Sequence, residues 1–244
     1  MTWQSEGIDV SGAQRPGSID WARVRSEGVS WAYVKASEGT TTVDASMVPH
    51  VQGAHAAGLL VGAYHYFHPK TDDLVKSAER FAALTDPLLL ELPPVIDVET
   101  LCGGPGCRAH PVAASPQELV DAVLTWCARV QSLLGRSPVL YSGPGFLAAL
   151  GRAGEALRAL PLWCADYRAT PSFPAGYDVV AWQWTDGGQT GPRQLTAGVQ
   201  VDRNRSPLTA RDLAELGLAT EPKCVARDIT PQDLFLTDPN IKNP

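Results

Sequence analysis

Short apolar segments, rich in β-branched and aromatic residues, recur along the chain, and more polar stretches separate them. Segments of this kind, bounded by glycine, proline and polar residues, are typical of β-strands. The pattern gives eight candidate strands at residues 6–12, 29–39, 58–69, 92–100, 137–143, 160–167, 178–186 and 198–204. Strands are therefore expected through most of the chain.

Helix-like stretches fill the early gaps between these strands. They cover residues 18–28, 43–58, 72–86 and 115–135. The first and the last begin at a serine, which is a good N-cap, and end at a glycine, which often stops a helix. In the last helix, Pro116 takes the first helical position and Glu118 places an acid in the first turn, and both residues favour a helix start.

The alternation of strands and helices predicts a parallel sheet with right-handed crossovers, and eight strands predict closure into a barrel. Several later connections are too short for a crossover helix. We therefore expect an α/β fold, an irregular (β/α) barrel with shortened connections in its second half. The barrel should form one domain over residues 1–218, with the polar, proline-dotted residues 219–244 as a C-terminal extension or linker.

Composition narrows the choice of partners. The 244 residues carry a net charge of −6 without any block of lysines or arginines, which argues against a nucleic-acid partner. No apolar run approaches the roughly 18 residues that a membrane-spanning helix needs. The opening MTWQSEGIDVSG lacks the basic start and apolar stretch of a signal peptide. We expect a monomer without a membrane span, and either a shortened start or an export route that this opening does not encode.

The five cysteines leave two interpretations open. Cys102 and Cys107 bracket a glycine- and proline-rich turn in CGGPGC, which can bring their Cα atoms within about 7 Å and allow a disulfide. The alternative is five reduced thiols. The spacing is not that of a zinc site, because no second close pair of Cys or His follows.

The stretch VIDVET, residues 95–100, places two carboxylates in an apolar run. Asp97 and Glu99 lie two positions apart, so on a strand both side chains project to the same side. Two like charges in a poorly solvated place raise one pKa and destabilise the fold. Sequences usually accept such a pair where it does chemistry.

Further acids and aromatics follow the candidate strands, at the ends where barrels of this type carry their reactive groups. Asp9, Asp166 and Asp202 each follow apolar residues. The aromatic residues near them are Tyr64, Tyr66, Tyr141, Trp163, Tyr167, Trp182 and Trp184. Carboxylates and aromatic faces together suit a carbohydrate, whereas acids alone also suit a divalent metal.

Some of these residues have plainer explanations. An isolated aspartate at a strand end usually caps a turn, which applies to Asp166. Trp182 and Trp184 share one strand face and Gln183 takes the other, and the alternation leaves open which face lines the barrel. Lys35 and Glu38 in VKASEG are expected to form an ion pair near the rim.

Seven motifs occur in order along the chain: GIDVSGAQ, VKASEG, GAYHYFHP, PPVIDVE, LWCADY, WQWT and VDRN. Together they resemble the family 25 glycoside hydrolases, which are barrel-type lysozymes, over roughly residues 6–204. The resemblance implies an irregular (β/α) barrel that acts outside the cell or on the cell wall. It also implies cleavage of the β-1,4 bond between N-acetylmuramic acid and N-acetylglucosamine in peptidoglycan, with no cofactor and no metal.

Carried over by position, the resemblance implies that Glu99 is the general acid and Asp97 its partner, with Asp9 and Asp202 as further cleft acids. The residues expected to contact substrate are Tyr64, Tyr141, Trp163, Asp166, Tyr167, Gln183 and Trp184. Glu99 lies nearer the strand end, and a charged Asp97 beside it would raise its pKa, which favours the same assignment.

Strand geometry sets the β-carbons of the two acids roughly 6.5–7 Å apart. Retaining glycosidases hold their carboxyl groups about 5–5.5 Å apart and inverting ones about 6.5–9.5 Å, so side-chain torsions can reach either range. The resemblance favours retention assisted by the substrate's own acetamide, with Asp97 orienting it. Two other functions stay open: a catalytically inactive cell-wall-binding module of the same fold, and a metal-dependent hydrolase.

Overall fold

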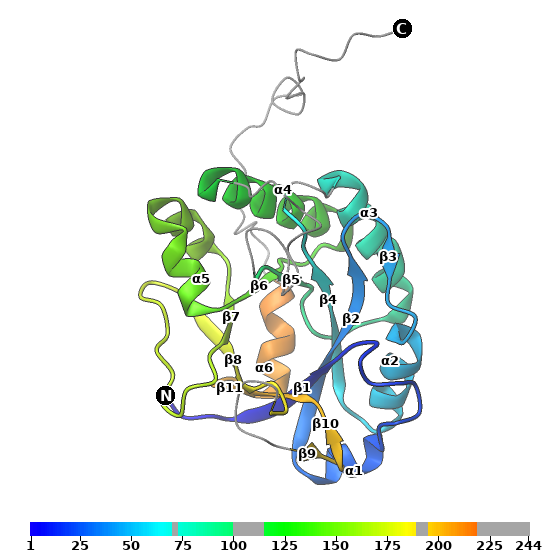
Figure 1. Ribbon diagram of the computed structural model, residues 1–244. Helices are drawn as coiled ribbons and strands as arrows, with labels where there is room; N and C mark the ends of the chain where they lie inside the picture. Colours follow the sequence, from blue (N-terminus) through cyan, green and yellow to red (C-terminus); the bar gives the residue numbers. More distant parts are fainter. Residues whose placement is uncertain (70–72, 100–114, 189–194, 219–244) are drawn as a thin grey trace, which may run out of the picture.

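The computed structural model describes residues 1–69, 73–99, 115–188 and 195–218. In this part of the chain, eight strands pair in a closed ring (Figure 1). In their order around the barrel they are β1 (Ser5–Val10), β11 (Asp202–Ser206), β8 (Val179–Thr185), β7 (Leu162–Ala165), β6 (Val139–Ser142), β5 (Val95–Asp97), β4 (Leu60–Tyr66) and β2 (Val29–Glu38). Parallel pairing of β1 with β2 closes the ring, which confirms the expected α/β barrel.

Three short strands lie outside this ring. β3 (Thr42–Val43) adds to the edge of β2. β9 (Leu195–Thr196) and β10 (Val199–Gln200) form a separate antiparallel hairpin before β11.

The last barrel strand corrects the prediction of a wholly parallel sheet. β11 pairs antiparallel with both β1 and β8, whereas the other barrel pairs are parallel. The described part of the connection from β8 to β11 holds the β9–β10 hairpin, and an antiparallel neighbour needs no crossover helix. Asp202 therefore begins its strand instead of ending it, yet it lies opposite Asp9 at the expected edge of the barrel.

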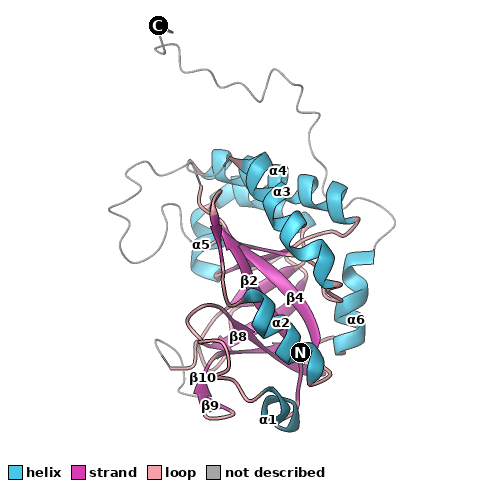
Figure 2. Ribbon diagram, turned by 90° about the vertical axis from the view of Figure 1, so that its right-hand side faces the viewer, coloured by secondary structure: helices cyan, strands magenta, loops and turns pink. Residues whose placement is uncertain are grey.

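The helices predicted for the first half are present, although the first is capped by Asp20 and not by Ser18. They are α1 (Trp21–Ser26), α2 (Met47–Ala56), α3 (Leu74–Thr85), extended by the 3-10 turn η1 (Asp86–Leu88), and α4 (Pro116–Leu134). Ser115 and Glu118 form a reciprocal capping box at the start of α4. Figure 2 shows α2 and α3 lying over β2 and β4, and α3 packs beside α4.

The second half has shorter connections, as expected. α5 (Pro144–Ala149) and the 3-10 helix η3 (Gly151–Ala159) link β6 to β7, and residues 166–178 join β7 to β8 without a helix. After β11 the chain forms α6 (Ala210–Glu215) and the 3-10 turn η4 (Leu216–Leu218).

Aromatic rings fill the interior of the barrel below the strand ends. Trp31 and Tyr33 of β2 point inward, and the Tyr33 ring stacks on Trp163 with centroids 5.0 Å apart. Glycines make room for them, since a Cβ at Gly7 or at Gly62 would stand 2.2 Å from the Trp31 or Tyr33 ring. Leu213 of α6 joins the same cluster, so these packed side chains fill the barrel at the end opposite the carboxyl ends of its parallel strands.

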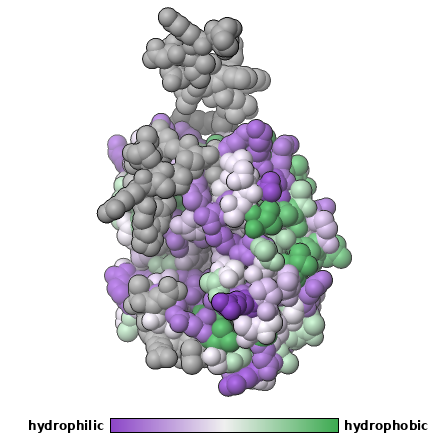
Figure 3. Space-filling view, turned by 45° about the vertical axis from the view of Figure 1, so that its right-hand side comes forward, coloured by the Kyte–Doolittle hydropathy of each residue, from purple (hydrophilic) through white to green (hydrophobic). Residues whose placement is uncertain are grey.

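The face of the molecule in Figure 3 is mostly hydrophilic, with separate apolar patches. None of the described helices combines the length and the apolar character needed to cross a membrane. Cys127 and Cys164 are both buried. The predicted Cys102–Cys107 disulfide and the predicted extension over residues 219–244 lie outside the described residues.

Candidate active site

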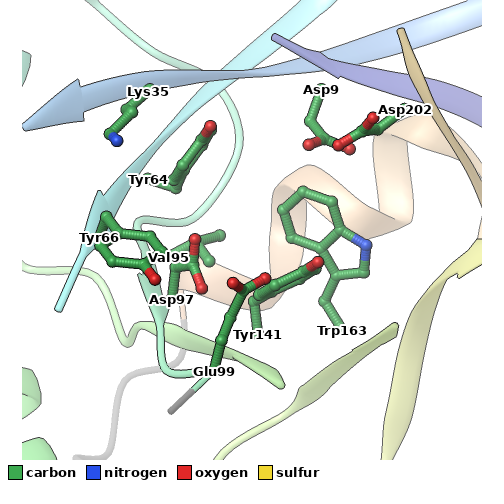
Figure 4. Close-up of a pocket in the computed structure, with 10 residues that line it drawn as sticks. All are labelled: Asp9, Lys35, Tyr64, Tyr66, Val95, Asp97, Glu99, Tyr141, Trp163 and Asp202. Atoms are coloured by element: carbon green, nitrogen blue, oxygen red, sulfur yellow. The ribbon is translucent and has the colours of Figure 1, made fainter. Parts of the chain in front are cut away.

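A pocket of about 220 Å³ opens where the parallel strands end (Figure 4). Seven of the residues expected at the site line it, namely Asp9, Tyr64, Asp97, Glu99, Tyr141, Trp163 and Asp202. The structure thus brings together side chains from six strands and from the turn after β5. Lys35, Tyr66 and Val95 complete the lining. Tyr66 was one of the aromatic residues noted near the acids, but none of the three was among the expected substrate contacts.

The two acids of VIDVET share the pocket because the strand geometry continues past the end of β5. The Val98 amide donates to the Tyr141 carbonyl at 3.0 Å, and the Val98 carbonyl accepts from Ser142 Oγ at 2.7 Å. Val98 itself is buried in the outer core, so Asp97 and Glu99 on either side of it turn inward. Asp97 is 6% exposed, whereas Glu99 reaches solvent.

Both carboxyls have raised pKa values. Burial raises the pKa of Asp97 well above its usual range, and the charge of Glu99 raises it further. Burial also raises the pKa of Glu99, although its hydrogen bond with Tyr141 and the charge of Lys35 lower it. Asp97 was expected to stay charged. Burial works against that charge in both carboxyls, because it favours the neutral form of each.

A second pair of acids lies across the pocket. Asp9 Oδ2 accepts hydrogen bonds from Asn204 Nδ2 at 2.7 Å and from Gln183 Nε2 at 3.0 Å. Gln183 Nε2 also lies 3.4 Å from Asp202 Oδ2. Burial, together with the nearby Asp9, raises the pKa of Asp202 to about 9, and burial raises the pKa of Asp9 as well. Asp202 therefore keeps its proton at neutral pH and shares it with Asp9.

The open question about β8 is settled by the partners of its side chains. Gln183 points into the barrel and is 1% exposed, so its amide is occupied by neighbours and lies behind the pocket wall. Trp184 points outward, where the Arg205 guanidinium lies 4.8 Å from its ring centroid. Trp182 shares the outer face and packs against Trp3. The structure does not bring Trp184 to the pocket.

Asp166 does not line the pocket and instead binds Arg168 in its own loop. Its carboxylate accepts from Arg168 Nε at 2.7 Å and Nη2 at 2.6 Å, and from the Ser172 amide at 2.8 Å. Burial alone would raise the pKa of Asp166, but these hydrogen bonds lower it overall. The side chain therefore organises the loop after β7, as the turn interpretation proposed. Tyr167 extends from the same loop, and its hydroxyl donates to Gln183 Oε1 at 2.6 Å.

The family model described as "Glycosyl hydrolases family 25" matches residues 8–192. The chain belongs to family 25 of the glycoside hydrolases.

Relatives of this family 25 enzyme include bacterial lysozymes. Lysozyme M1 of Streptomyces globisporus is 30% identical over 208 residues, which cover 82% of this chain and 67% of that protein. The uncharacterized protein YegX of Escherichia coli is 35% identical over 188 residues, covering 75% of this chain and 64% of YegX. The chain thus spans about two thirds of the length of either relative.

Solved structures agree with the sequence relatives. The crystal structure of the lysozyme from Streptomyces coelicolor superposes with a TM-score of 0.72 at 28% identity. The match covers 89% of this chain and 99% of that one, so the barrel described above is the family 25 fold.

Two polar residues of this family 25 site were missed in the sequence. Lys35 forms the expected ion pair with Glu38, with Nζ to Oε2 at 2.5 Å, but it also lines the pocket and stands 5.0 Å from the Tyr66 ring centroid. Asn204 bonds to Asp9 and accepts from Trp163 Nε1 at 2.8 Å. A signal for Asn204 was available, because it lies two residues after Asp202 on the same strand face.

Proposed function

We propose that the chain hydrolyses peptidoglycan at the β-1,4 bond between N-acetylmuramic acid and N-acetylglucosamine. The observation that carries the proposal is the convergence of a buried carboxyl, Asp97, and a solvent-reaching carboxyl, Glu99, in one pocket, both with raised pKa values. A glycosidase needs such a pair to protonate the leaving oxygen and to support positive charge on the sugar. The lysozymes among the relatives support the same substrate class.

Glu99 is proposed as the general acid because it is the member of the pair that reaches solvent and hence the bound glycosidic oxygen. The productive form of the pair places the single shared proton on Glu99 and the negative charge on Asp97. Lys35 supports one negative charge on the pair, because its own charge lowers the pKa of Asp97 and that of Glu99. A bound glycan also removes water from Glu99, which disfavours its charged form and draws the proton to it.

Asp97 is proposed to act on the substrate's acetamide. Its Oδ1 is buried and has no hydrogen-bond partner among the described residues, so it is available to a ligand donor such as an amide N–H. An ionised Asp97 there would orient the acetamide oxygen toward the anomeric carbon and stabilise the cation that forms. This arrangement leads to a product with retained configuration.

The remaining lining residues would hold the sugar. Tyr64, Tyr141 and Trp163 offer ring surface, while Asp9 and Asp202 offer polar atoms to hydroxyl groups. Asp166, Tyr167, Gln183 and Trp184 are left out of this proposed contact set, because they are not among the residues that line the pocket. The proposed partner is therefore the glycan strand of the bacterial cell wall, taken up by a single copy of the chain.

Digestion of purified peptidoglycan tests the proposal. We expect new reducing ends that carry muramic acid, identified by borohydride reduction and mass spectrometry. Glucosamine ends would replace the proposed specificity with that of a glucosaminidase. Absence of new ends, combined with co-sedimentation with insoluble peptidoglycan, would favour the inactive binding module. Loss of activity with a chelator would favour the metal-dependent hydrolase.

A further inference from the structure

Both polar side-chain atoms of Gln183, which lies behind the pocket, have hydrogen-bond partners. Its Nε2 donates to Asp9 Oδ2 at 3.0 Å and lies 3.4 Å from Asp202 Oδ2. Its Oε1 accepts from Tyr141 Oη at 2.8 Å and from Tyr167 Oη at 2.6 Å. The side chain is 1% exposed, so it links the two sides of the pocket without offering an atom to substrate.

The neighbours fix which way this amide faces. The carboxylate of Asp9 can only accept, so the NH₂ group must lie on the side of the acids. The carbonyl oxygen then faces both tyrosines, and each tyrosine must donate its proton to it. Gln183 thereby sets the direction of every hydrogen bond that it makes.

Tyr141 connects Gln183 to Glu99 through its hydroxyl group. Its hydroxyl contacts Gln183 and also hydrogen-bonds with Glu99. A hydroxyl has one proton, so while Tyr141 donates to Gln183 it can only accept from Glu99. In that arrangement the hydrogen bond between Tyr141 and Glu99 forms only while Glu99 is protonated. Once Glu99 ionises, the hydroxyl has to leave Gln183 in order to donate to the new carboxylate.

We infer that Gln183 is a positioning residue that competes for the Tyr141 hydroxyl proton and thereby keeps the catalytic proton on Glu99. The inference rests on the proposed function, in which Glu99 is the general acid. Gln183 acts through Tyr141 and touches neither substrate nor the reacting atoms. After proton transfer to the leaving oxygen, the Tyr141 hydroxyl turns to the Glu99 carboxylate, and it returns to Gln183 when Glu99 is protonated again.

Other charged and titratable groups also face Glu99, so the test must separate them from Tyr141. They come from five strands: Asp9 of β1, Lys35 of β2, Tyr64 and Tyr66 of β4, Asp97 of β5, and Asp202 of β11. Gln183 contacts two of them, Asp9 and Asp202, and could influence Glu99 through these acids instead.

A double-mutant cycle of Gln183→Met and Tyr141→Phe makes the separation. The pKa of Glu99 is read by carboxyl ¹³C NMR of the unliganded protein, with the resonance assigned by Glu99→Gln. The alkaline limb of kcat/KM against pH gives an independent reading, because that limb reports the acid of the free enzyme. Methionine keeps the length of Gln183 and removes its polar atoms.

Gln183→Met should lower the pKa of Glu99 by about one unit, because Tyr141 then donates to the carboxylate without competition. Tyr141→Phe should raise the pKa, because the carboxylate loses its donor. In the Tyr141→Phe background, Gln183→Met should cause no further shift. Tyr177→Phe is the matched control, since its hydroxyl bonds to the Gly154 carbonyl far from the acids, and it should leave the pKa of Glu99 in place.

Two results overturn the inference. A downward shift of equal size in the Tyr141→Phe background would show that Gln183 acts through Asp9 and Asp202. An unchanged pKa in Gln183→Met would show that it does not act on Glu99. If Gln183→Met does not fold, Tyr141→Phe alone decides, since an unchanged or lowered pKa of Glu99 would contradict a Tyr141 hydroxyl that turns between Gln183 and Glu99. Failure of the wild type to cleave peptidoglycan would refute the proposed function separately, because the NMR titration needs no turnover.

Discussion

The two halves of the barrel are built differently. In the first half, helices such as α2, α3 and α4 cover the outer faces of the strands, and Trp126 of α4 is completely buried against His65 and Phe81. In the second half, the outer face of β8 packs against side chains of other segments: Trp182 contacts Trp3 and Phe173, and Trp184 stays half-buried beside Arg205. The strands of the first half are thus covered by a layer of helices, whereas those of the second half are covered by separate side-chain contacts.

The difference extends into the site. Asp97, Glu99 and Lys35 come from the first half, which supplies the groups proposed to react. Gln183 and Asp202 come from the second half, which supplies hydrogen bonds and a proton-sharing acid. The regular half thus carries the acid pair, and the irregular half supplies the groups that influence the protonation of the pocket acids.

The strongest test of this division compares two acids that look alike in sequence. Glu99→Gln should reduce turnover by about 10²–10⁴-fold with the fold retained, because the amide cannot donate the acid's proton. Asp166→Asn should stay within about tenfold of wild type, while its unfolding free energy falls by about 1–2 kcal/mol through loss of the Arg168 contacts. Soluble-glycan release and urea unfolding measure the two effects. Comparable turnover in Glu99→Gln would move the acid role to Asp202.

The next test breaks the outer layer of each half in turn. Trp126→Ala should destabilise the protein by about 3–5 kcal/mol, because it leaves a cavity in a fully buried cluster. Trp184→Ala should lose only about 1–2 kcal/mol, because solvent already reaches that side chain. Urea midpoints at a constant m-value give both numbers. Equal losses of unfolding free energy in the two variants would contradict this difference between the two halves.

Asp97→Asn tests the acid pair itself. A neutral amide cannot stabilise the cation formed by the acetamide, so we expect a rate loss of about 10²–10³-fold. NMR of the wild-type product, read before mutarotation, should show the β-anomer first. A first-formed α-anomer would mean inversion, and would recast Asp97 or Asp202 as the base that activates water. Undiminished cleavage of a glycan lacking the N-acetyl group would exclude acetamide assistance.

The sequence was most informative about the first half. Its strands and helices follow simple periodicity and end at clear caps, so Ser115 and the stretch around Asp97 were placed correctly. The direction of β11 could not be read, because the apolar run 198–204 divides into the end of a hairpin and the start of an antiparallel strand. Asp202 was placed at the correct edge although the strand direction was wrong.

The site residues show the same limit. Alternation paired Asp97 with Glu99, but it could not say which face of β8 looks inward, since Gln183 and Trp184 are equally plausible on either face. The partner of Asp166 was also hidden, because Arg168 can form a fork around a carboxylate only once the loop has turned. Protonation of the acids depends on burial depth, which no local pattern encodes.

The smallest expected effect concerns the stability that the second half loses as pH rises. Asp202 is an aspartate whose pKa is raised to about 9 in the folded protein, against an unfolded value of about 3.9. Between these values the folded state binds the proton and the unfolded state does not. Stability therefore falls as pH rises through this window, and the contribution is fully present only below about pH 4.

Asp202→Asn removes this titration while keeping a polar group beside Asp9. Relative to wild type, the unfolding free energy of the variant should rise by about 1 kcal/mol or more between pH 4 and pH 8. This corresponds to a relative rise in Tm of about 2–4 °C. Thermal melts across the pH range measure it, with the exposed Asp178→Asn as the matched control. Parallel curves for Asp202→Asn and wild type would mean that Asp202 ionises in the folded protein as it does in the unfolded chain. The proton between Asp9 and Asp202 would then have no place in the site, and the second half would contribute hydrogen bonds alone.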